Sequence, residues 1–244
     1  MKENKYDDPQ FFQAYGKIQR SLEGLEGAGE WPVLRSMFPD VLGMHVLDLG
    51  CGYGWHCRYI IEKGANSVVG VDISEKMLEK AKEINGIKEV EYMQSALEDL
   101  QFSAHSFDFI FSSLTLHYLM DYEGFMASVY DWLKPGCRFV FSVEHPIFTA
   151  EGSQEWFKDE AGNLLHWPVD QYFKEGQRHP KFLDIELVKY HRTLSTYVQT
   201  LLKLGFELLE IQEPTPSKEK LAKDPAWRVE LRRPMMLLIS VKKN

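Results

Sequence analysis

The feature that most constrains this chain is an apolar run that breaks into three glycines on alternate positions, Val46-Leu47-Asp48-Leu49-Gly50-Cys51-Gly52-Tyr53-Gly54, before a helical pattern. Glycine is needed where a buried strand ends in a sharp turn and where the backbone must approach a ligand without a Cβ in the way. A second strand-like run, Ser67 to Val71, ends at Asp72, 22 residues after Gly50. An acid at this spacing can accept hydrogen bonds from both hydroxyls of a ribose. The two runs therefore predict a site for a nucleotide-type ligand.

The spacing of these glycines separates two classes of cofactor. Dinucleotide-binding proteins carry G-x-G-x-x-G before the helix that faces the pyrophosphate, whereas this chain has G-x-G-x-G and Trp55 where the third glycine would stand. The pattern favours S-adenosylmethionine. With the acid that ends the next strand, Asp-Leu-Gly-Cys-Gly-x-Gly closely resembles the first two motifs of the class I S-adenosylmethionine-dependent methyltransferases. The resemblance is specific from Trp31 to Val143 and elsewhere rests on general layout.

Length, charge and cysteine content narrow the class of protein. The 244 residues suit one α/β domain, 1–244, with a decoration. Three cysteines without CxxC spacing, and no apolar run of signal-peptide or membrane-spanning length, predict a soluble cytoplasmic protein. A net charge of −8 argues against a nucleic-acid partner. A homodimer is compatible with the sequence.

Alternating strand and helix signals predict a Rossmann-like fold with a parallel sheet. Strands are expected at 46–49, 67–71, 89–93, 106–112, 138–143, 206–210 and 235–241. Helices are expected at 55–63 and 193–204, and after the capping residues Ser74 and Asp121. Lys134-Pro135-Gly136 should end the helix that follows Asp121. Seven strands result, and the resemblance implies that the last two form an antiparallel hairpin at the sheet edge.

The stretch from Pro146 to Tyr190 interrupts this alternation. It contains a turn signal at Ala161-Gly162-Asn163, and its aromatic residues include Trp156, Phe157, Trp167, Tyr172 and Phe173. An insertion at the carboxyl end of a strand lies over the crevice where open α/β sheets bind ligands. We therefore expect 146–190 to cover the substrate. An aromatic packing flap without ligand contact is the alternative.

The resemblance also implies a set of cofactor contacts. Asp48 and the backbone of Gly50, Cys51, Gly52 and Gly54 would flank the methionine part, together with Ser113 and Leu114. Asp72 would take the ribose, and Ile73 and Met77 would lie near the adenine. The segment Ser95–Leu100 resembles the next family motif, but Ala96 stands where many members carry Asp. The backbone of Leu97 or the side chain of Glu98 must therefore supply the contact to the adenine amino group.

The N-terminal segment, 1–40, is expected to be helical and to lie over the cofactor, as such helices often do in the resembled family. Its aromatic residues, Tyr15 among them, could shield the methyl group, and Arg20 could pair with a carboxylate. An amphipathic helix that only packs on the sheet explains the same residues.

Candidate catalytic groups follow the fourth and fifth strands and the insertion: His117, Tyr118, Glu144, His145, His191 and Arg192. Methyl transfer from a sulfonium chiefly needs an aligned nucleophile and the exclusion of water, so a general base is optional. His145 or His191 could take a proton near neutral pH, and Arg192 could meet an acidic acceptor. The histidines and Glu144 lack the short spacing that would fix metal ligands on one helix face, so no metal is predicted.

These observations predict a methyltransferase that moves a methyl group from S-adenosylmethionine to O or N of a small-molecule acceptor. Two alternatives stay open. A NAD-type Rossmann oxidoreductase shares the sheet and the ribose acid, and a non-catalytic S-adenosylmethionine-binding protein shares the cofactor site.

Overall fold

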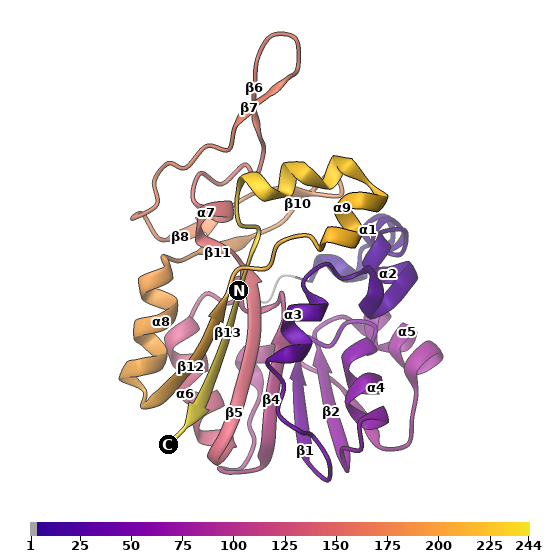
Figure 1. Cartoon of the computed structure of the whole chain (residues 1–244). Coiled ribbons are helices and arrows are strands. Elements are labelled where there is room, and N and C mark those ends of the chain that lie inside the picture. The colour runs from indigo at the N-terminus through magenta and orange to yellow at the C-terminus, as the bar shows by residue number, and fades with distance from the viewer. Residues whose placement is uncertain (1–3) are drawn as a thin grey trace.

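One seven-stranded sheet organises the computed structural model, which describes residues 4–244 (Figure 1). The strand order is β12-β13-β5-β4-β1-β2-β3. The strands are β1 (His45–Leu49), β2 (Ser67–Asp72), β3 (Val90–Gln94), β4 (Phe107–Ser113), β5 (Leu133–Glu144), β12 (Phe206–Gln212) and β13 (Met236–Lys243). Strands β1 to β5 pair in parallel, and β13 runs antiparallel to both of its neighbours. The α/β class and the antiparallel pair of C-terminal strands are confirmed.

Helices cover both faces of this sheet (Figure 1). One face packs against α3 (Trp31–Ser36), α4 (Trp55–Glu62) and α5 (Glu75–Asn85), and the other against α6 (Tyr122–Trp132) and α8 (Leu194–Lys203). Alternate residues of β4 serve opposite faces, since Phe109 and Phe111 join the α3–α4–α5 core whereas Ile110 joins the α6–α8 core. Burial on both sides explains why the central strands are almost wholly apolar.

Side-chain caps fix where several helices begin. Ser74 accepts a hydrogen bond from the Met77 N–H at the start of α5, and Asp121 accepts one from the Gly124 N–H at the start of α6. Both caps were predicted. The predicted end of α6 was wrong: the helix ends at Trp132, and Lys134 to Gly136 already belong to β5. The register between β4 and β5 shifts there, which accommodates the proline within the strand.

The remaining elements gather above the carboxyl ends of the parallel strands (Figure 1). At the N-terminus these are η1 (Lys5–Asp7), α1 (Pro9–Tyr15), α2 (Gln19–Glu23) and η2 (Gly24–Gly27). The loops after β3 and β4 carry η3 (Leu97–Asp99) and η4 (Leu116–Tyr118), and the stretch before β13 carries α9 (Lys218–Lys223) and η5 (Pro225–Arg232). Between residues 4 and 244, no helix has the length and apolar character needed to cross a membrane.

The insertion 146–190 begins with α7 (Pro146–Thr149) and continues as short strands. These are β6 (Phe157–Lys158), β7 (Leu164–His166), β8 (Gly176–Arg178), β9 (Lys181–Phe182), β10 (Ile185–Glu186) and β11 (Lys189–His191). Strands β6 and β7 pair across the predicted turn, and this hairpin projects away from the rest of the molecule at the top of Figure 1. Strand β11 returns to pair with β8.

Candidate active site

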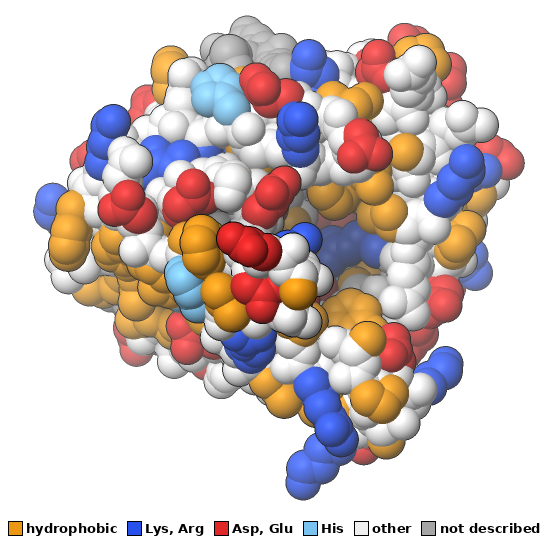
Figure 2. All heavy atoms as spheres, turned by 90° about the horizontal axis from the view of Figure 1, so that it is seen from above, with side chains coloured by type: hydrophobic (Ala, Val, Ile, Leu, Met, Phe, Trp, Pro, Cys, Tyr) orange, Lys and Arg blue, Asp and Glu red, His pale blue; other side chains and the backbone are white. Residues whose placement is uncertain are grey.

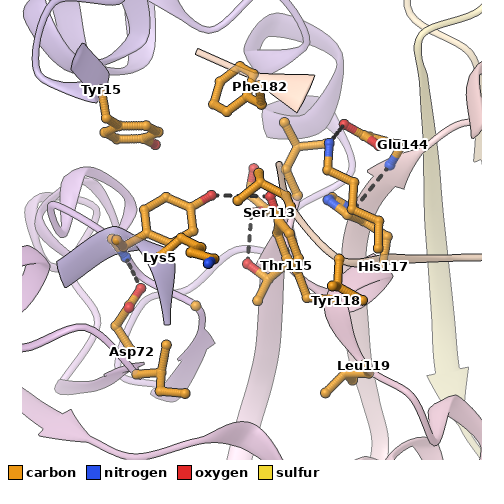
Figure 3. A pocket seen from close by; sticks show the side chains of 18 of the residues that line it. Lys5, Tyr15, Asp72, Ser113, Thr115, His117, Tyr118, Leu119, Glu144 and Phe182 are labelled. Atoms are coloured by element: carbon orange, nitrogen blue, oxygen red, sulfur yellow. Dashed lines mark hydrogen bonds and ion pairs between the residues drawn. The ribbon is translucent and has the colours of Figure 1, made fainter. Parts of the chain in front are cut away.

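A cavity of about 480 Å³ lies at the carboxyl ends of β1, β2, β4 and β5, under the N-terminal segment and the insertion. Seen from above, the molecule is hollowed, with Lys or Arg side chains inside the hollow (Figure 2). One end of the cavity is lined by the glycine loop, Asp72 and the loop after β3. The other end is lined by the loops after β4 and β5 and by the insertion (Figure 3).

The three glycines of the loop after β1 differ in what surrounds the position of a side chain. A Cβ at Gly50 would lie 2.1 Å from the Thr115 hydroxyl, and one at Gly54 would lie 2.1 Å from the Tyr92 hydroxyl, so both positions are closed by neighbouring side chains. A Cβ at Gly52 would meet nothing within 4 Å, at a φ of +52°. Gly52 also lines the cavity. Its bare backbone therefore leaves room for a ligand where a side chain would project.

Asp72 forms the floor beside this loop, as Figure 3 shows. One carboxylate oxygen accepts the Gly52 N–H and the other accepts the Ser74 N–H, both at 2.9 Å. Burial raises the pKa of this carboxyl to about 6 in spite of these two bonds. Each oxygen keeps a lone pair for a further donor. Ile73 and Met77 line the cavity next to it.

Asp48 lies under the glycine loop and not in the cavity. The side chain is fully buried, and its Oδ2 accepts the Cys57 thiol at 3.2 Å. It shares the strand face of Val46, which points into the α3–α4–α5 core. Burial raises the pKa of this carboxyl to about 7. Asp48 is therefore not among the residues that line the cavity, which corrects the expectation that its side chain flanks the ligand.

The other residues expected around the cofactor are divided. Those that line the cavity are Gly50, Ala96, Leu97, Glu98, Ser113, Leu114, Tyr15 and Arg20. Cys51 borders a smaller neighbouring cavity of about 60 Å³, and Gly54 lines neither. Leu114 has a φ of +53°, a conformation that leucine rarely adopts, and its N–H donates to the Ser142 carbonyl.

The N-terminal segment is fastened to the start of α5 beside the cavity. The Asp7 carboxylate accepts the Ser74 hydroxyl at 2.5 Å and the Lys76 N–H at 3.1 Å, and the Lys76 ammonium donates to the Asp7 carbonyl. Next to Asp7, the Tyr6 hydroxyl lies 3.2 Å from the Tyr118 hydroxyl, across the cavity. Arg20 is ion-paired with the buried Glu30, so its carboxylate partner lies within the segment.

Three of the six catalytic candidates line the cavity: His117, Tyr118 and Glu144. His117 Nδ1 accepts the backbone N–H of Glu144 at 3.4 Å, which leaves the proton of the neutral ring on Nε2. Burial lowers the pKa of His117 to about 4. The imidazole is therefore neutral, and its Nε2–H is a hydrogen-bond donor.

The structure does not bring His145, His191 or Arg192 to the cavity, so the roles expected for them are corrected. His145 Nδ1 accepts the Ile147 N–H and so caps α7, and its Nε2 lies 2.7 Å from Glu213 Oε1. Both ring nitrogens of His191 are bonded, to the Thr149 hydroxyl at 2.7 Å and to the Tyr172 carbonyl at 2.9 Å. A histidine with both nitrogens engaged cannot take a proton from an acceptor.

Arg192 is buried and donates to main-chain carbonyls on the loop after β4, those of Leu119 and Met120. Its guanidinium also lies over the Tyr122 ring, with its carbon 5.2 Å from the ring centroid. The side chain therefore braces that loop from behind and does not face an acceptor.

The insertion does reach the cavity, but the residues that line it are not the aromatic residues expected to form a wall. The lining residues are Phe148, Gln154, Lys181, Phe182, Leu187, Val188 and Lys189. Trp156 and Trp167 instead pack around the Arg233 guanidinium, with centroids 5.6 and 4.4 Å away. Phe173 is 90% exposed. Sequence reasoning missed Lys189, although a lysine inside the run Leu187-Val188-Lys189-Tyr190 was a visible signal of a buried charge.

Comparisons with known proteins agree on the class of this site. A family described as "Methyltransferase domain" matches residues 47–141. A solved S-adenosylmethionine-dependent methyltransferase of Mesorhizobium loti is 41% identical, with a TM-score of 0.84, over 90% of this chain and all of that one. A solved structure from Listeria monocytogenes, described as a putative S-adenosylmethionine-dependent methyltransferase, is 50% identical, with a TM-score of 0.86, over 91% of this chain and 99% of that one.

The chain belongs to the S-adenosylmethionine-dependent methyltransferases. The predicted family, fold and methyl donor are thereby confirmed. An uncharacterised protein of Haemophilus influenzae is 31% identical over 98% of this methyltransferase and 96% of its own length. Other curated relatives match over a smaller part of their own length. The chain spans 52% of an uncharacterised methyltransferase of Synechocystis and 26% of phosphoethanolamine N-methyltransferase 1 of Arabidopsis thaliana.

Proposed function

We propose that this methyltransferase acts, as a single domain over 1–244, on an oxygen or a nitrogen of a small molecule held under the insertion 146–190. The observation that carries the proposal is one continuous cavity, whose walls join the glycine loop and Asp72 to residues of the insertion and of the N-terminal segment. Enclosure between such elements suits a small acceptor better than a macromolecular surface.

The chain's own residues fit S-adenosylmethionine at the first end of this cavity. Asp72 would accept the two ribose hydroxyls with its remaining lone pairs, and the open Gly52 backbone would lie against the methionine part. Ile73 and Met77 would contact the adenine, with Leu97 or Glu98 at its amino group. When bound, the cofactor supplies a methyl group on a positively charged sulfur.

The second end would hold the acceptor and exclude water. Tyr6 and Tyr118 meet across the cavity, and Phe182 approaches from the insertion. Holding a nucleophile in line with the methyl group is worth up to about 7–11 kcal/mol of the barrier in favourable cases. Positioning by these walls is therefore the main contribution that we assign to the protein.

Two observations favour a small acceptor over a nucleic acid. Phosphoethanolamine N-methyltransferase 1 of Arabidopsis thaliana, whose name states a small acceptor, is 32% identical over 132 residues. A tRNA U34 carboxymethyltransferase of Cellvibrio japonicus is 27% identical over 155 residues, but the net charge of −8 opposes binding to a polyanion.

The test is calorimetric titration with S-adenosylhomocysteine and with NAD. We expect S-adenosylhomocysteine to bind and Asp72→Ala to weaken it by about 1.5–3 kcal/mol, the worth of a hydrogen bond to a charged group. Glu79→Gln, at an exposed position of α5, is the control and should bind as the parent does. Preference for NAD, or unchanged affinity in Asp72→Ala, would contradict the cofactor assignment.

A further inference from the structure

A buried ion pair stands at the acceptor end of the cavity. The Lys189 ammonium, in a residue 3% exposed, lies 2.5 Å from Glu144 Oε1 and 3.3 Å from Gln154 Oε1. Gln154 in turn donates to the other oxygen of Glu144 at 2.6 Å. The rings of Tyr118 and Phe182 flank the ammonium, with centroids 6.0 and 5.8 Å away. Figure 3 shows Glu144 near His117 at the cavity wall.

The polar side chains at the acceptor end donate hydrogen bonds or carry charge, but they are poorly suited to accept a proton from an acceptor molecule. His117 uses Nδ1 to accept a main-chain N–H, so its proton is on Nε2. Burial opposes ionisation of Glu144, but the Lys189 ammonium, His117 and the hydrogen bond from Gln154 together hold the pKa of that carboxyl below its ordinary value. Burial raises the pKa of Tyr6 far above its ordinary value. Among the described residues just named, none is a base matched to neutral pH.

We propose that the acceptor is a small carboxylic acid with an apolar body, and that its carboxylate oxygen is the atom methylated, held by the Lys189 ammonium and the Nε2–H of His117. This deepens the proposed function and rests on it. The rest of this end is mainly apolar, with Leu119, Phe148, Leu187, Val188, Met235 and Met236 in its walls. Lys181, from the same insertion, also lines the cavity.

A carboxylate explains why this end can work without a base. The acceptor oxygen forms a bond to the methyl carbon while the bond from that carbon to sulfur breaks, and its electron pair stays on sulfur. A carboxylate and a sulfonium thus give a neutral methyl ester and a neutral thioether, and no proton moves. An amine that binds as its ammonium would first have to lose a proton, which His117, Glu144 and Tyr6 are poorly suited to accept.

The experiment compares head groups on two skeletons. 3-Phenylpropanoate, 3-phenylpropylamine and 3-phenylpropanol, and octanoate, octylamine and octanol, are each incubated with the protein and S-adenosylmethionine labelled in the methyl group. Mild alkali releases the label from a methyl ester as volatile methanol and leaves N-methyl and ether products intact. We expect alkali-labile product from the acids only.

Each outcome bears on one proposal. Methylation of an amine or alcohol at a rate equal to or above that of its acid overturns the carboxylate proposal. Failure of all six compounds while S-adenosylhomocysteine binds also overturns it, and leaves the cofactor assignment standing. Failure to bind S-adenosylhomocysteine overturns the proposed function itself.

Variants then test the wall. Lys189→Met should raise the KM for the acid about 10- to 100-fold and leave the affinity for S-adenosylhomocysteine unchanged. Because it leaves the buried Glu144 unpaired, the neutral double variant Lys189→Met/Glu144→Gln is measured with it, and circular dichroism checks both folds. Lys88→Met, at a side chain 89% exposed, is the matched control. An unchanged KM in both folded variants refutes the role of Lys189.

The pH profile gives a second readout. With saturating cofactor, the rate with the acid should be flat from pH 7 to pH 9, because no group has to lose a proton. A rate that rises through a titration in this range would show a base at work and would overturn the proposal.

Discussion

The affinity of the protein for S-adenosylhomocysteine should depend on pH through Asp72. Accepting two ribose hydroxyls needs the ionised carboxylate, and the pKa of Asp72 is raised to about 6 by burial. At pH 5 only about one site in eleven is ionised, so the affinity should fall about tenfold between pH 7 and pH 5, or about 1.4 kcal/mol. Calorimetric titration across pH 5 to 8 measures this directly.

Folding stability should respond to the same group in the opposite direction. The folded-state pKa lies above the ordinary value of 3.8, so ionising Asp72 costs stability. That cost is absent below pH 3.8, grows up to about pH 6 and is complete above it. The contribution of Asp72 to the stability of the ligand-free protein therefore improves between pH 7 and pH 5, while affinity declines.

Two variants decide whether Asp72 is responsible. Asp72→Asn should bind weakly and lose the pH dependence, whereas Glu79→Gln should keep the parental slope. A parental affinity that is flat between pH 5 and pH 8, or the same slope in Asp72→Asn, would refute the reasoning.

Three further predictions concern the loop, the insertion and the N-terminal segment. Gly52→Val should abolish S-adenosylhomocysteine binding in titration while the circular dichroism spectrum stays parental, because its side chain would project into the cavity at a positive φ; normal binding would show that the loop does not approach the ligand. His191→Phe should lower the free energy of unfolding by about 1–3 kcal/mol, since the Thr149 hydroxyl and the Tyr172 carbonyl each lose a hydrogen bond to the imidazole, and should leave affinity unchanged in calorimetry; a loss of affinity at parental stability would return His191 to the site. Asp7→Ala should speed dissociation of S-adenosylhomocysteine in stopped-flow measurements, because the Ser74 hydroxyl loses its acceptor beside the cavity; a parental rate would mean that this attachment does not retain the ligand.

The cofactor end could be predicted from the sequence because its constraints are local. Each of its three parts is visible within a few residues of the sequence: a strand, a turn with little room for side chains, and an acid at the end of the next strand. The same reasoning failed for Asp48, whose side chain follows the strand alternation into the core. It is the parity of a residue along a strand, and not its nearness to the motif, that decides whether it faces the cavity.

The acceptor end could be predicted only in outline. That the insertion would reach the cavity followed from its place after β5. Glu144 was expected at the carboxyl end of the fifth strand, where the structure has it. Its partner Lys189 lies 45 residues further along the chain, and no periodicity signals such a pairing. His145 follows Glu144 directly but turns to cap α7, which no spacing rule anticipates.

The position of β13 in the sheet means that the sheet cannot be completed until the end of synthesis. The strand is made after every other strand of the sheet, yet it lies between β12 and β5. Until it emerges from the ribosome, both neighbours present unpaired edges, which are templates for wrong pairing between chains. Met235 and Met236, at the start of β13, also complete the cavity wall. A nascent chain therefore has its glycine loop long before it has an acceptor site, and shortening the chain by this one strand would both open the sheet in its interior and remove part of that wall.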